Sequence, residues 1–185
     1  MSPISIYSCI TLGAIASVAV LLTACAGASM TEAAMAPDVP AAIKAGDGEK
    51  IAFLWHAIGS QVYECRADAK GATAWAFIAP EADLFDSRGA KVGTHGAGPH
   101  WAAADGSKTI GTVKARAPGE GAPDVPWLLL AAKPEGSGRM AAVTSVQRIH
   151  THGGNASPAG CAQAADAGKQ LKQPYTADYV FFVAK

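Results

Sequence analysis

The five histidines of this 185-residue chain are the side chains with the widest chemical scope: His56, His95, His100, His150 and His152. His150 and His152 stand two apart, so a continuous strand would project both from one face, a spacing that two metal ligands can use. His95 and His100 lie in a glycine-rich stretch that could bring a further ligand. One hypothesis is therefore a copper or zinc site built from these five residues. The other is that they make ordinary hydrogen bonds and that the protein has no cofactor.

Aromatic side chains offer a second kind of site. Trp101 follows His95 and His100 directly in the glycine-rich stretch, which we expect to be a loop. Exposed rings beside polar groups bind sugars and other small ligands, and binding residues concentrate on loops. We therefore predict a ligand-binding site at His95, His100 and Trp101. The alternative is that the tryptophans belong to the core, as aromatic residues on strands usually do.

Carboxylates could supply acid–base chemistry. Glu81, Asp83 and Asp86 lie close together in the sequence, and a pair of carboxylates flanking a cleft can hydrolyse glycosides. Asp86, however, precedes Gly89 in a stretch typical of a turn. The sequence contains neither a nucleophile elbow nor the histidine motif of zinc proteases. A non-catalytic binding or interaction domain is the favoured interpretation, with a metalloenzyme or metal-binding protein as the alternative.

The elements that must position these residues are mostly strands. Short runs rich in β-branched and aromatic residues alternate with turns marked by glycine and aspartate, which predicts a single-domain β-sandwich or closed barrel. One short helix is expected over 158–167, with Ser157 as its N-cap and Pro158 in its first turn. The expected strands cover residues 50–56, 61–67, 73–79, 91–93, 109–116, 127–132, 143–150 and 175–183.

The patterns within three strands predict which faces are buried. The apolar run 128–130 has no polar side and indicates a central strand. The aromatic residues of 175–183 recur at even spacing and predict a core face. In 111–116, alternation places Thr112, Lys114 and Arg116 on one face, opposite Val113 and Ala115.

The N-terminus predicts export. Residues 1–24 contain no Lys, Arg, Asp or Glu, and their apolar run is too short for a membrane span of roughly 20 residues. The run ends in Leu22-Thr23-Ala24-Cys25, which resembles the lipobox of bacterial lipoproteins. We thus expect a signal peptide over 1–24, a lipidated Cys25 with a tether over 25–40, and one β-rich domain over 41–185. The resemblance implies a lipid-anchored envelope protein, at the outer membrane if the host is Gram-negative; the alternative is a secreted protein.

Cysteine usage indicates the redox environment of the protein, and its charge limits the classes of partner it could bind. With Cys9 in the signal peptide and Cys25 as the lipid site, Cys65 and Cys161 remain, and an exported chain favours a disulfide between them. The 15 basic and 15 acidic residues balance to a formal charge of zero. Nucleic acid is therefore not expected as a partner, because phosphate binding needs a basic surface. The expected partners are the membrane, through the lipid anchor, and a small ligand, a glycan or another envelope protein.

Motifs along the mature chain resemble the family called domain of unknown function 3455. The resemblance implies no activity, since the family has none assigned. A dinucleotide-binding oxidoreductase is excluded, because no glycine-rich turn joins a strand to a helix. The motifs are Gln61-x-Tyr63-x-Cys65, Trp75-Ala76-Phe77-x-Ala79-Pro80-Glu81, Gly93-x-His95-x-x-Gly98-Pro99-x-Trp101, Asp105-Gly106-Ser107, Pro126-Trp127, Gln147-Arg148, Gly153-Gly154 and Pro174-Tyr175-Thr176-Ala177-Asp178-Tyr179.

Overall fold

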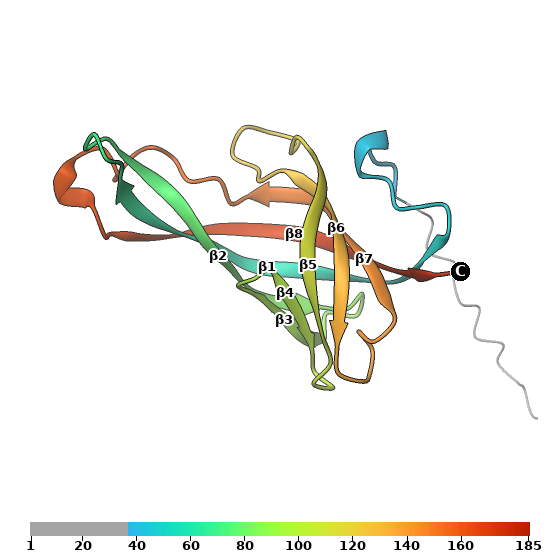
Figure 1. The fold of residues 1–185 in the computed structure, drawn as a ribbon. Coiled ribbons are helices and arrows are strands. Elements are labelled where there is room, and N and C mark those ends of the chain that lie inside the picture. Colours follow the sequence, from blue (N-terminus) through green and yellow to red (C-terminus); the bar gives the residue numbers. More distant parts are fainter. Residues whose placement is uncertain (1–36) are drawn as a thin grey trace, which may run out of the picture. The chain divides into compact units, whose positions relative to one another are not determined.

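A computed structural model describes residues 37–185, so the predicted signal peptide, Cys25 and most of the tether lie outside the described residues. The fold is mostly β, as predicted: eight antiparallel strands close into a barrel in sequence order. In Figure 1 the long strands β1 and β8 run side by side, and β5, β6 and β7 cross them. The strands are β1 (Glu49–Ala67), β2 (Thr73–Phe85), β3 (Lys91–Gly96), β4 (His100–Ala103), β5 (Lys108–Ala117), β6 (Trp127–Glu135), β7 (Val143–Gly153) and β8 (Gln170–Ala184).

The barrel has an apolar interior and a smaller apolar cluster on its outer surface. Leu128 and Leu130 of β6 belong to the interior core, whereas Leu129 between them packs outside against Ile43 and Phe182. The 3-10 turn η1 (Ala41–Ile43) brings Ile43 to this outer cluster, and the Gln147 Nε2 donates to its carbonyl oxygen at 2.6 Å. The prediction that 128–130 is apolar on both sides is confirmed. The interior also contains the aromatic face predicted for the last strand.

Two strands depart from regular alternation at β-bulges, where the register of pairing shifts. In β5 the shift falls between Val113 and Ala115, so that Val113 and Arg116 both line the barrel interior and Ala115 packs in the outer cluster. The face predicted for Arg116 is therefore wrong, because one bulge reverses every side chain beyond it. In β7, the shift between Val143 and Ser145 places Val143 and Val146 on the same interior face, whereas Ile149 packs in the outer cluster, which together explain why the apolar residues recur at period three.

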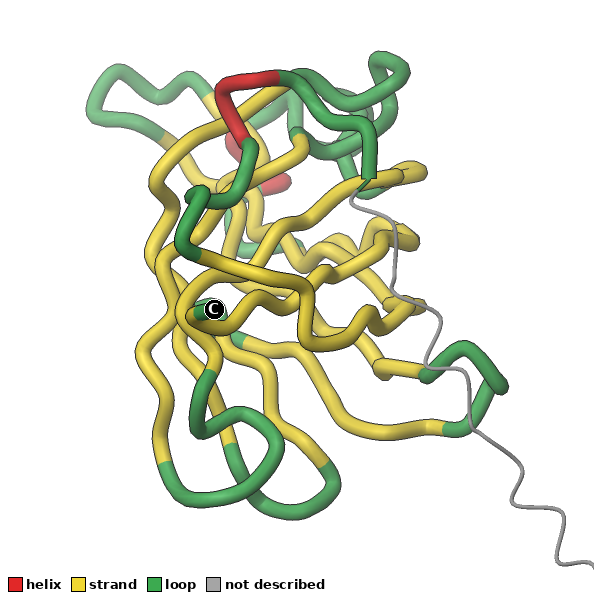
Figure 2. Tube along the Cα trace, turned by 90° about the vertical axis from the view of Figure 1, so that its right-hand side faces the viewer, coloured by secondary structure: helices red, strands yellow, loops and turns green. Residues whose placement is uncertain are grey.

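The prediction of a helix over 158–167 is wrong. That segment contains only a 3-10 turn, η2 (Ala164–Asp166), and the helical parts of residues 37–185 are η1 and η2 alone. Figure 2 shows how short these turns are beside the strands. Gly160 adopts a left-handed backbone conformation, which ends any helix there, and the Asp166 carboxylate accepts from the backbone N–H of Ala162 and Gln163 instead. No helix in residues 37–185 is long and apolar enough to span a membrane.

The predicted disulfide between Cys65 and Cys161 is confirmed, with the two Cα atoms 5.5 Å apart. It joins β1 to the long connection between β7 and β8. Backbone hydrogen bonds on either side of Cys65 reinforce this junction: its N–H donates to the carbonyl of Lys169, and its carbonyl accepts from Gly168. The bridge thereby fixes a segment that has almost no regular structure of its own.

Candidate functional site

The barrel interior contains a cavity of about 420 Å³, which opens to the surface beside exposed side chains of β2 and β5. An eight-stranded barrel is just wide enough either to fill with side chains or to hold one small ligand. The lining is predominantly apolar and aromatic and includes no Asp or Glu. It comprises Gln61, Tyr63, Phe77, Ile78, Pro80, His95, Gly98, Pro99, Trp101, Val113, Arg116, Val125, Pro126, Leu128, Leu130, Arg148, Asn155 and Tyr179.

One wall of the cavity is a stacked pair of rings. His95 on β3 lies directly opposite Trp101 on β4, and their rings stack with centroids 4.7 Å apart. Trp101 is only 1% exposed, and its ring lies so close to Gly111 that a Cβ there would approach it to 2.8 Å. A side chain at position 111 would therefore displace the tryptophan. The glycine-rich stretch that we expected to be a loop is in fact the β3–β4 hairpin, and it points these two rings into the barrel rather than toward solvent.

His100, the third residue of the predicted ligand site, lies at the edge of this hairpin rather than in the cavity. Its Nδ1 pairs with the carbonyl of Ala97 at 2.7 Å, which closes the turn between β3 and β4. Its own carbonyl oxygen accepts a hydrogen bond from the His95 ring at 2.7 Å. The structure thus brings His95 and Trp101 together in the cavity wall, with the His100 backbone orienting the His95 ring.

Burial keeps His95 neutral. Removal from solvent lowers its pKa from 6.5 to about 3, against the opposing effect of the hydrogen bond to His100, and the positive charge of Arg148 adds to the lowering. Because a carbonyl can only accept, the Nδ1 must carry the proton, which leaves Nε2 as an acceptor. His95 therefore presents a neutral imidazole to the cavity wall.

Two further polar groups in the lining are buried without a partner among the described residues: the Nε1–H of Trp101 and the Nε2 of Gln61. Both atoms have less than 1 Å² of accessible surface, so they lie behind the cavity surface rather than open to it. The neighbouring Tyr63 is satisfied, because its hydroxyl donates to the carbonyl of Gly154 at 2.8 Å. The surface that the cavity offers is therefore predominantly apolar.

The histidines predicted as metal ligands do not all converge. His56 and His150 do come together, since the Nδ1 of each lies 2.9 Å from an oxygen of Asp178. His152 is exposed near the end of β7, and His95 is inside the barrel. Among residues 37–185 no group of three or more His, Cys, Asp or Glu side chains has the arrangement of a metal site. Sequence reasoning missed Asp178, which only the pairing of β1 and β7 with β8 brings to both histidines.

The carboxylates considered for glycoside hydrolysis do not flank the cavity. Glu81 pairs with Lys172, and Asp83 pairs with Lys91. Asp86 accepts from the backbone N–H groups of Arg88 and Ala90, the role of a turn residue. None of the three carboxylates is buried in the apolar kind of environment that would favour acid catalysis. The arrangement supports binding better than hydrolysis.

Sequence reasoning also missed the other polar residues of the cavity, Gln61, Arg116 and Arg148. Arg148 is half-buried, and both its Nε and its Nη2 donate to the Pro126 carbonyl, at 3.0 and 2.8 Å. Gln61 and Arg148 occur in the motifs quoted above, but nothing in their spacing shows that they face one interior. Arg116 was predicted to lie on the other face of its strand, because the bulge in β5 was not foreseen.

Comparison with known proteins gives one match. Neither a curated protein nor a solved structure is similar to the chain at a significant level. A protein-family model matches residues 45–183, which take in all eight strands of the barrel and the cavity residues they carry. The chain therefore belongs to the family described as a protein of unknown function, DUF3455.

Proposed function

We propose that this protein is an exported, lipid-anchored binding protein whose barrel holds a small, largely apolar ligand in its cavity, without catalysis. The observation that carries the proposal is the cavity of about 420 Å³, within the range of roughly 300–1,000 Å³ typical of small-molecule sites. Its lining is predominantly apolar and aromatic and includes no Asp or Glu. A small apolar ligand fits this lining better than a glycan, which would need many more hydrogen-bonding groups.

Binding of a neutral apolar dye tests the proposal. Phenylnaphthylamine fluoresces strongly only when removed from water, and we expect the purified protein to bind it saturably, with one site per chain. Val113→Trp should weaken this binding at least tenfold, because Val113 lines the cavity while remaining 37% exposed, so a larger side chain enters the mouth without disturbing the core. Leu54→Trp is the matched control, since Leu54 is 43% exposed and lies outside the cavity.

The control variant should bind the dye as the wild type does. Equal binding by the wild type and the Val113→Trp variant would show that the dye occupies another surface. Absence of saturable binding to the wild type would contradict the proposed cavity function.

The lipid anchor is a separate part of the proposal and rests on the lipobox-like sequence that ends at Cys25. Bacteria producing the protein should incorporate labelled palmitate into it and retain it in the membrane fraction. Cys25→Ser should abolish the labelling and release the protein. Labelling that persists in this variant would contradict lipidation at Cys25, and an unlabelled wild type would favour secretion.

Metal binding is a second candidate, and one observation favours it: Asp178 orients both His56 and His150 through their Nδ1 atoms and leaves each Nε2 free to coordinate. Elemental analysis of the purified protein by plasma mass spectrometry tests it. About one equivalent of copper or zinc, lost in His150→Ala, would support a metal site. Protein free of metal, and unable to retain added copper or zinc, would exclude it.

A further inference from the structure

The polar side of the cavity is formed by two arginines that strand pairing brings to the same interior face. Arg116 on β5 lies opposite Leu128 on β6, and Leu128 lies opposite Arg148 on β7. Residues directly opposite one another on neighbouring strands share a face of the sheet. Since Leu128 belongs to the interior core, both arginines lie on the face of the sheet that lines the cavity, where Arg148 is half-buried and Arg116 stays exposed to solvent.

Neither guanidinium has a carboxylate partner among residues 37–185. The ion pairs formed within this range involve six other Lys and Arg residues and include neither Arg116 nor Arg148. Arg148 donates to the neutral carbonyl of Pro126 and lies within hydrogen-bonding reach of the Tyr179 hydroxyl, and neither group carries a negative charge. The unpaired state is notable for Arg148, which is half-buried, because burial of an unpaired charge is costly, whereas Arg116 is exposed. The cavity thus contains positive charge that nothing in its own lining neutralises.

The field of Arg148 extends across the cavity. Burial raises the pKa of Tyr63 and of Tyr179, and at both hydroxyls the charge of Arg148 acts in the opposite direction by favouring the anionic form.

We infer, on the basis of the proposed function, that the ligand is an apolar molecule carrying a single acidic group. Its apolar body lies against the aromatic wall, and its anionic head lies between Arg116 and Arg148. Guanidinium groups suit such a head, because they donate two parallel hydrogen bonds to a carboxylate or similar oxyanion. The lining contains no carboxylate, so it also selects against ligands with a cationic head, which the arginines would repel.

Two dyes that share one skeleton test this inference. Anilinonaphthalenesulfonate carries a sulfonate that phenylnaphthylamine lacks, so the ratio of their affinities isolates the contribution of the charge. We expect the anionic dye to bind wild-type protein about tenfold more tightly than the neutral dye, and 1 M salt to reduce that ratio.

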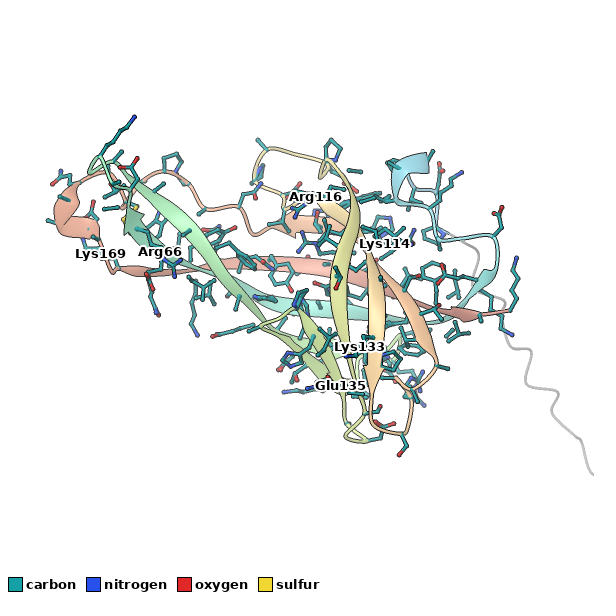
Figure 3. The ribbon with its side chains drawn as sticks, in the orientation of Figure 1. Arg66, Lys114, Arg116, Lys133, Glu135 and Lys169 are labelled. Carbon is teal, nitrogen blue, oxygen red and sulfur yellow. A yellow bond between two sulfur atoms is a disulfide. The ribbon has the colours of Figure 1, made fainter. Side chains whose placement is uncertain are left out.

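Variants of the two arginines locate the effect. Arg116 makes no ion pair, so Arg116→Gln should leave the fold intact, weaken the anionic dye about threefold to fivefold and change the neutral dye by less than twofold. Arg148→Gln should weaken the anionic dye about tenfold. Lys114→Gln is the matched control, since Lys114 lies two residues from Arg116 on β5 without lining the cavity (Figure 3).

The outcomes separate this inference from the proposed function. Equal affinities for both dyes, unchanged in Arg116→Gln, would overturn the anionic head while leaving cavity binding intact. An equal loss in Lys114→Gln and Arg116→Gln would also overturn it, because a general charge effect would then suffice. Binding of neither dye would overturn the inference together with the proposed function. Far-ultraviolet circular dichroism confirms the fold of each variant, since the anionic dye also binds partly folded states; if Arg148→Gln does not fold, Arg116→Gln decides.

Discussion

Replacing His95 should remove a large part of the acid sensitivity of this fold. The pKa of His95 falls from 6.5 to about 3 because the ring is buried. Between these two pH values the unfolded chain binds a proton at this residue and the folded chain does not. The free energy of unfolding contributed by His95 is therefore complete above pH 6.5, falls by about 1.4 kcal/mol per pH unit below it and levels off near pH 3.

The magnitude can be worked for an accessible interval. From about pH 7.5 to about pH 5.0 the wild type should lose about 2 kcal/mol of stability through His95 alone. This figure depends almost entirely on the unfolded-state pKa, since the folded-state value of about 3 lies well below the interval. His95→Asn keeps an N–H donor for the carbonyl of His100 but has no group that titrates, so its stability should fall by about 2 kcal/mol less over the same interval.

Urea denaturation at the two pH values, followed by tryptophan fluorescence, measures the difference. The rest of the chain is identical in the two proteins, so its contribution cancels when the two pH dependences are subtracted. His152→Asn is the matched control for the loss of a histidine, because His152 is exposed. If His95→Asn shows the same loss as the wild type, His95 is protonated in the fold and the account of a neutral, buried ring is wrong.

Three other substitutions give further tests of the structure. Replacing Cys65 and Cys161 together by Ala opens a loop of 96 residues and should cost up to about 4.7 kcal/mol in urea denaturation, with wild type under reductant as the control; no change would mean that the bridge constrains little. Trp101→Ala should cost about 3–5 kcal/mol, because the ring is 1% exposed in the core, and a loss below about 1 kcal/mol would indicate an exposed ring. His150 has a φ of 47°, so His150→Gly should be about 1 kcal/mol more stable than His150→Ala, whereas equal stabilities would argue against the left-handed backbone there.

The parts of the fold that could be predicted are those in which local pattern and tertiary structure agree. Leu128, Leu129 and Leu130 are apolar on both sides because one side faces the barrel and the other faces η1. The even spacing of Tyr175, Tyr179 and Phe181 indicated their burial correctly. The disulfide followed from counting cysteines in a chain that we expected to be exported, which needs no geometry.

The parts that could not be predicted depend on register. A bulge in β5 turns Arg116 inward, and no feature of residues 111–116 reveals it. His95 and Trp101 looked like loop residues because glycines surround them, yet those glycines form the turn of a hairpin whose strands are four to six residues long. The cavity itself depends on closure of the barrel, which places residues from β1 to β8 around one space. Sequence reasoning therefore reached two of the cavity residues, His95 and Trp101, and placed them on the wrong kind of element.

The most direct test of the central claim is the indole N–H signal of Trp101 in a proton–nitrogen correlation spectrum during titration with phenylnaphthylamine. The chain has four tryptophans, and Trp101 is the one that lines the cavity, so Trp101→Phe assigns its signal. The account predicts that this signal shifts saturably with the dye while that of Trp75, outside the cavity, stays in place. A Trp101 signal that does not move while the dye saturates would contradict a ligand site inside the barrel.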